Sequence, residues 1–170
     1  LAALLRVALV LPQGACSAPA DSAIVEAREA LRKKDRNRLA AARTAAMAAN
    51  HPLAMWADYF ELNNRLAEAQ QSELDAFYAR WPATYVEDRL RNDWLLELGK
   101  RRDWANLARE LPRFRMNDDR EVTCYALLVE HQNAPQGSKA TPAFKARAFD
   151  AWVAQRDLDD GCNLMATALY

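Results

Sequence analysis

Glycine, histidine and cysteine are scarce in this sequence, with 4, 2 and 3 copies among 170 residues. So little glycine argues against sheet-and-turn folds and against the Gly-rich loops that bind phosphates. Two histidines and three cysteines leave little material for a metal site. Lys plus Arg and Asp plus Glu both number 23, so the formal net charge is zero. Nucleic-acid-binding proteins normally carry a basic excess, and we therefore expect no nucleic-acid partner.

Long hydrophobic runs are missing too. No run reaches the roughly 18 apolar residues that a membrane span requires, so we expect no transmembrane helix in the mature chain. Hydrophobic residues nevertheless make up 51% of the sequence. At the length of about one ordinary domain, this is enough to build a core.

The first 20 residues have the features of a secretory leader. An apolar run with one Arg comes first, a polar stretch with Cys16 follows, and Ala-Pro-Ala at 18–20 resembles a cleavage site. We predict that 1–20 is the remnant of a signal peptide and that 21–170 is the folded part. Two alternatives remain open: lipid attachment at Cys16, or an apolar N-terminal helix packed on the body.

From Asp21 onward, apolar residues recur at helical spacing, and no segment alternates with the two-residue period of a strand. Asp35 and Asp103 stand where a side chain can cap the start of a helix, and Pro52, Pro82 and Pro112 interrupt the pattern. The nine predicted helices begin near Asp21 or Ser22, Asp35, Pro52, Ser72, Tyr85, Asp103, Asp119, Pro142 and Asp160.

The connections between these helices are short, which makes neighbouring helices antiparallel. A weak internal repeat is visible: Lys34–Ala40 matches Arg102–Ala108, and each copy places a Leu four residues after the capping Asp. We therefore predict an all-α fold of antiparallel helical hairpins stacked as an α-superhelix, or solenoid. An irregular helical bundle is the alternative.

The ionisable residues form no catalytic pattern. His51 and His131 lie in no His-x-x-x-His motif, and His51, beside a Pro in a turn, is interpreted as a surface or capping residue. Carboxylates such as Glu61, Asp88 and Glu97 are interpreted as a solvated face rather than a catalytic pair, which would need an apolar pocket. We predict no catalytic, cofactor-binding or metal-ligating residue in this chain, and no cofactor.

Two cationic clusters, Arg32–Arg38 and Lys100–Arg102, lie at predicted helix ends, where cations complement the helix dipole. Alternatively, they line one side of a solenoid and contact an anionic polymer. The tryptophans occur at helical spacing with other apolar residues, so core packing is the main interpretation and stacking on sugars the alternative. They are Trp56, Trp81, Trp94, Trp104 and Trp152.

Removal of the leader would take Cys16 with it and leave Cys124 and Cys162. An even pair of cysteines in an exported chain favours one disulfide. Two buried, reduced thiols are the alternative.

Three segments carry a resemblance to a known family. Residues 51–62 (HPLAMWADYFEL) look like a helix of the soluble lytic murein transglycosylases, and residues 77–82 (FYARWP) resemble the turn that follows. Residues 90–104 (LRNDWLLELGKRRDW) are similar to a helical hairpin of the same N-terminal, U-shaped superhelical domain. Cys124 and Cys162 match two family positions that pair as a disulfide.

The resemblance implies a periplasmic enzyme that cleaves the β-1,4 bond between N-acetylmuramic acid and N-acetylglucosamine, leaving a 1,6-anhydro end. One Glu, followed by Ser in the family motif, acts first as acid and then as base. Glu-Ser occurs nowhere in this sequence; the nearest is the reverse, Ser72-Glu73. This part of the superhelix is therefore expected to lack lytic activity, with a lysozyme-like catalytic domain following beyond residue 170.

On this interpretation the chain is a fragment truncated at both ends, and its partners are the glycan strands of peptidoglycan and its own C-terminal catalytic domain. The expected location is the periplasm, or the outer membrane if the protein is a lipoprotein. The alternative function is a non-catalytic periplasmic helical-repeat module that binds peptides or partner enzymes. A third hypothesis is a cytoplasmic repeat adaptor.

Overall fold

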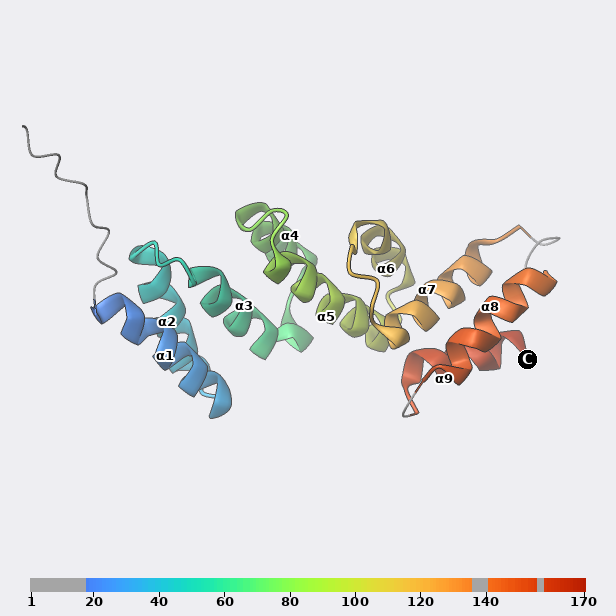
Figure 1. Cartoon of the computed structure of the whole chain (residues 1–170), viewed down its shortest axis with the longest axis horizontal. Coiled ribbons are helices and arrows are strands. Elements are labelled where there is room, and N and C mark those ends of the chain that lie inside the picture. Colours follow the sequence, from blue (N-terminus) through green and yellow to red (C-terminus); the bar gives the residue numbers. More distant parts are fainter. Residues whose placement is uncertain (1–17, 136–140, 156–157) are drawn as a thin grey trace, which may run out of the picture.

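The computed structural model describes residues 18–135, 141–155 and 158–170. The predicted leader at 1–17, with Cys16, lies outside these residues. All regular elements in the described residues are helices, which confirms the all-α prediction. They progress along the long axis of the molecule, from the first two helices side by side at one end to the last two side by side at the other (Figure 1). In the same part of the chain, no helix is both long and apolar enough to cross a membrane.

Most boundaries lie close to those expected from the sequence. The first predicted helix differs most, because it begins at Ala18 rather than at Asp21 or Ser22. The elements are α1 (Ala18–Arg32), α2 (Arg36–Ala48), α3 (Ala54–Asn64), η1 (Leu66–Glu68), α4 (Gln71–Arg80), α5 (Tyr85–Arg101), α6 (Trp104–Glu110), η2 (Leu111–Arg113), α7 (Arg120–Asn133), α8 (Pro142–Val153) and α9 (Asp160–Leu169).

Side-chain caps start several of these helices. The Asp35 and Asp103 carboxylates accept the backbone N–H three residues ahead, as predicted. The third helix starts at Ala54, two residues after Pro52, and the Leu53 N–H donates to Nδ1 of His51 in the preceding turn. His51 is buried rather than on the surface, and its second ring nitrogen lies 2.9 Å from the Asp21 carboxylate of α1.

The internal repeat of the sequence is a repeated helix corner. Lys34 and Arg102 both adopt the left-handed conformation, with φ of 54° and 59°. In each case the next residue, Asp35 or Asp103, donates its N–H to the carbonyl five residues earlier, at 2.9 and 3.0 Å. The same Asp then caps the following helix. The corner between α1 and α2 and the corner between α5 and α6 are thus built in the same way.

The core changes in character along the chain. Between α1, α2 and α3 it is made mostly of alanines, such as Ala27, Ala30 and Ala46. From α3 to α7 it is built from aromatic residues and leucines. Gly99 sits where a Cβ would come within 2.3 Å of the Tyr125 ring, so only glycine lets α5 approach α7 this closely.

The third core cluster joins α7, α8 and α9. Cys124 and Cys162, both fully buried, form a disulfide with an S–S distance of 2.02 Å. This ties α7 to α9 and uses the two cysteines that the family resemblance pairs. Trp152 departs from the core interpretation: it is 39% exposed and lies beside Phe149 on the outer side of α8.

Candidate functional site

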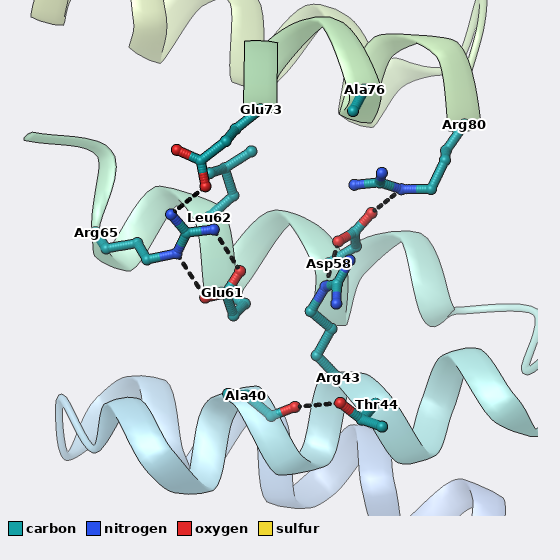
Figure 2. A pocket seen from close by; sticks show the side chains of 10 residues that line it. All are labelled: Ala40, Arg43, Thr44, Asp58, Glu61, Leu62, Arg65, Glu73, Ala76 and Arg80. Atoms are coloured by element: carbon teal, nitrogen blue, oxygen red, sulfur yellow. Dashed lines mark hydrogen bonds and ion pairs between the residues drawn. The ribbon is translucent and has the colours of Figure 1, made fainter. Parts of the chain in front are cut away.

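A cleft of about 310 Å³ opens where α2, α3 and α4 meet. We call it the α2–α4 cleft (Figure 2). Its polar walls hold three arginines and three carboxylates, and the remaining lining is small or apolar. The lining residues are Ala40, Arg43, Thr44, Asp58, Glu61, Leu62, Arg65, Glu73, Ala76 and Arg80.

Helical spacing brings these side chains together. On each helix the lining residues recur after three and four positions, and the adjacent pairs Arg43/Thr44 and Glu61/Leu62 widen the same face. The stripe on α3 consists of residues 58, 61 and 62, and Arg65, the C-cap of the helix, continues it. The lining residues of α2 and α4 face those of α3 from either side in Figure 2, and both helices run antiparallel to α3.

Asp58 is the centre of one half of the cleft. Its side chain is 1% exposed, and its carboxylate accepts hydrogen bonds from Nε of Arg43, Nε of Arg80 and Nε1 of Trp81, the last two at 2.9 and 2.8 Å. Burial opposes ionisation of this carboxyl, but the hydrogen bonds from Trp81, Arg43 and Arg80 outweigh it and hold its pKa below the usual value. Asp58 therefore remains charged and fixes both arginines.

Arg65 is the centre of the other half. Its guanidinium donates to Glu61 at 2.7 Å and to Glu73 at 2.6 Å, so it joins α3 to α4. The Glu73 carboxylate also accepts the backbone N–H of Gln70. The pKa of Glu73 is lowered, first by that N–H and then by Arg65. Its side chain thus both starts α4 and positions an arginine in the cleft.

A second cluster of this kind lies between α4, α5 and α6, and we call it the Glu110 network. Glu110 is fully buried; it accepts from Nη1 of Arg91 and, at 3.1 Å, from the amide of Gln71. The Gln71 carbonyl in turn accepts from Nε1 of Trp94. Arg91 also donates to Glu87 at 2.7 Å. The network crosses three helices without opening to solvent at its centre.

The carboxylates correct the prediction of a solvated face. Asp88 is buried, and it accepts the backbone N–H groups of Arg115 and Met116, which stabilises the segment after η2. Asp58 and Glu110 are buried as well. The burial of Asp58 could have been predicted from the sequence, because this residue interrupts an apolar run of Ala, Met, Trp, Tyr and Phe in α3.

The two cationic clusters do not form a free positive stripe. In the first, Arg32 pairs with Glu29 and Arg36 pairs with Glu68. In the second, Arg102 pairs with Asp160, and Arg101 pairs with Glu97 in the same way. Each of these arginines has an acidic neighbour, so much of the positive charge of both clusters is compensated within the protein.

His131 packs against Phe144, with ring centroids 5.9 Å apart. Among the described residues, no group of three or more His, Cys, Asp and Glu side chains is arranged to hold a metal ion.

No protein-family model matches this chain, and no curated protein or solved structure matches it. The family resemblance therefore rests on the sequence motifs alone.

Proposed function

We propose that this chain is the substrate-positioning scaffold of a periplasmic peptidoglycan lytic transglycosylase, with its helices forming the first part of an α-superhelix. The observation that carries the proposal is the segment 90–104, whose resemblance to the family is the most specific. It forms α5 from Leu90 to its end, the corner at Arg102 and the start of α6. The same corner occurs between α1 and α2, as expected for a repeated hairpin.

The α2–α4 cleft supplies a surface for the polymer. Arg43, Arg65 and Arg80 are each about one-third exposed, at 30%, 31% and 35%. Peptidoglycan offers hydroxyl and amide groups on its sugars and carboxylates on its peptides. Guanidinium groups donate to all of these, and to carboxylates in a two-bonded arrangement. The proposed role of the cleft is to hold a strand while a separate domain cleaves it.

The outer side of α8 fits the proposed attachment of further helical or catalytic parts of the same protein. Phe144 and Ala148 face the core, whereas Phe149, Trp152 and Val153 are exposed along the other side. A helix that is apolar on two sides is suited to lie between two packed layers. In a superhelix each hairpin covers the apolar face of the one before it.

Cosedimentation with purified peptidoglycan sacculi tests the proposal. We expect the purified, oxidised chain to sediment with sacculi. The cleft variant Arg43→Gln/Arg65→Gln/Arg80→Gln should bind several-fold less, because the donors to the polymer are removed. Circular dichroism at the same temperature shows whether the variant keeps its helices. Because Glu-Ser is absent, no anhydro-muropeptide should be released.

The matched control removes the same number of charges outside the cleft, as Arg28→Gln/Arg36→Gln/Arg120→Gln. It should bind sacculi as well as the unmodified chain. If the chain does not sediment, or if the two triple variants lose binding equally, the proposal is wrong. The alternative is a periplasmic protein-binding module, favoured by the presence of both charge signs in the cleft, which suits a peptide of mixed charge. It predicts binding to free peptides and none to glycan.

A further inference from the structure

A second hollow, separate from the α2–α4 cleft, lies over the Glu110 network. It has a volume of about 390 Å³ and lies between α4, α5 and the α6–η2 segment. Its lining holds three guanidinium groups and one carboxylate: Asp75, Tyr78, Arg91, Arg109 and Arg113. Asp75 already accepts a hydrogen bond from Gln71 at 2.9 Å. Because Arg91 is paired with Glu110 and Glu87, the excess of positive charge and of hydrogen-bond donors in the lining comes from Arg109 and Arg113.

Two of these arginines have no close acceptor. Arg109 and Arg113 are one helical turn apart, and their side chains are 51% and 58% exposed. In the described part of the chain, their ionic contacts are with Glu110, at 3.9 and 3.7 Å, beyond hydrogen-bond distance. Glu110 is already satisfied by Arg91 and Gln71. Their donors are therefore free to serve another anion.

Two buried donors in the same place are also unsatisfied. The Tyr78 side chain is more than nine-tenths buried, and its hydroxyl has no hydrogen-bond partner; the same holds for Nε of Arg91. The Arg91 guanidinium lies over the Tyr78 ring, 3.9 Å from its centroid. Burial is the main reason that the pKa of Tyr78 is raised, so the phenol keeps its proton and acts as a donor. Buried donors without an acceptor are rare in folded proteins.

We propose that this hollow binds a ligand group with anionic oxygens, a carboxylate or a phosphate. Arg109 and Arg113 provide the charged donors at its mouth, and Tyr78 and Arg91 form its wall. An anionic group offers acceptors to these donors, makes charge-assisted hydrogen bonds with Arg109 and Arg113, and balances their charge. The site does not depend on the function proposed for the α2–α4 cleft, because the two share no lining residue.

Titration with inorganic phosphate, and in a separate arm with acetate, tests this assignment. NMR signals of the arginine Nε–H groups report binding at individual side chains. We expect saturable shifts at Arg109 and Arg113. The variant Arg109→Gln/Arg113→Gln should bind at least about ten-fold more weakly, because it removes both charged donors. The arm with the tighter binding identifies the anion as phosphate-like or carboxylate-like.

The variant Tyr78→Phe distinguishes a ligand donor from a structural hydroxyl. It keeps the ring under Arg91 and removes a hydroxyl that has no partner. We therefore expect anion affinity to fall several-fold while Tm without added anion stays the same or rises. As a control, Arg36→Gln, which lines neither the α2–α4 cleft nor this hollow, should leave anion affinity unchanged. The assignment is wrong if the shifts do not saturate, if the double variant binds normally, or if Tyr78→Phe lowers Tm.

Discussion

The α2–α4 cleft and the Glu110 network each surround a buried carboxylate with arginine, but they differ in where the arginine lies. In the cleft, Arg43 and Arg80 reach Asp58 while about a third of each side chain stays exposed. In the network, Arg91 is only 3% exposed. A guanidinium at the surface can turn to water or to a ligand when its partner is lost, whereas a buried one cannot.

This difference distinguishes arginines that can be released from their partners from an arginine that supports the fold. Pairing two buried charges returns little net stability, but removing one partner from a buried pair is costly. The Glu110 network is therefore expected to hold α4, α5 and α6 in place with little freedom to rearrange. The α2–α4 cleft keeps its arginines available at a small cost. One substitution, Arg to Met, tests this at three levels of exposure.

Arg91→Met should have the largest effect. It leaves the fully buried Glu110 carboxylate without its guanidinium partner, and we expect a loss of about 3 to 5 kcal/mol in the free energy of unfolding. Urea denaturation followed by circular dichroism measures this. Adding Glu110→Gln should recover much of the loss, because the uncompensated charge is then removed. A loss below about 1 kcal/mol in the single variant would show that the network does not support the fold.

Reduction of the Cys124–Cys162 disulfide comes next in size. The bond closes a loop with a sequence separation of 38 residues, and its loss should cost about 4 kcal/mol on the chain-entropy model. We expect the effect to be concentrated in α7, α8 and α9, which share one core cluster. Hydrogen exchange of the reduced protein should show faster exchange there. Equally faster exchange in α2 and α3 would mean that the α2–α4 cleft is not independent of the C-terminal helices.

Arg43→Met should cost far less than Arg91→Met, at about 1 kcal/mol. Asp58 keeps the hydrogen bonds from Arg80 and Trp81, and the lost donor lies partly in water. The same urea titration provides the measurement. If Arg43→Met and Arg91→Met were equally destabilising, exposure of the arginine would not be what separates the two clusters.

Acid should weaken the α2–α4 cleft. The folded-state pKa of Asp58 is lowered, so its charged form contributes stability above the unfolded pKa of about 4, and that contribution is lost as pH falls through the folded value. The unmodified chain should therefore lose its advantage over Asp58→Asn between pH 5 and acid pH. Urea midpoints of both proteins across this range report the difference. A difference that stays constant with pH would contradict the role given to this carboxylate.

Local features of the fold could be predicted from the sequence, because each depends on neighbours along the chain. Asp35 and Asp103 cap their helices through hydrogen bonds that span three residues. The helical period likewise predicts that Trp94 lies in the core, and it is 1% exposed. Trp152 has the same spacing but lies outside, since periodicity alone does not tell which of two apolar sides of α8 faces the body.

The candidate sites could not be predicted, because their partners come from different helices. Arg43 and Asp58 are 15 residues apart, and Gln71 and Glu110 are 39 apart. Burial of Glu110 depends on how α4, α5 and α6 pack, which no local pattern contains. For the same reason, the excess of donors around Tyr78 became visible only in the assembled structure.

Arg36→Met should have the smallest effect of the three Arg-to-Met variants. Arg36 and Glu68 form an ion pair of 2.6 Å with both side chains more than half exposed. Such pairs gain little over hydration and lose their attraction in salt, so we expect no measurable change in the urea midpoint at 0.15 M salt. The three variants should then rank by exposure of the arginine, with 3%, 30% and 57% giving a large, a small and no effect. If Arg36→Met destabilised the protein as much as Arg43→Met, partial exposure would not make the cleft arginines easy to release, and their availability to a ligand would lose its physical basis.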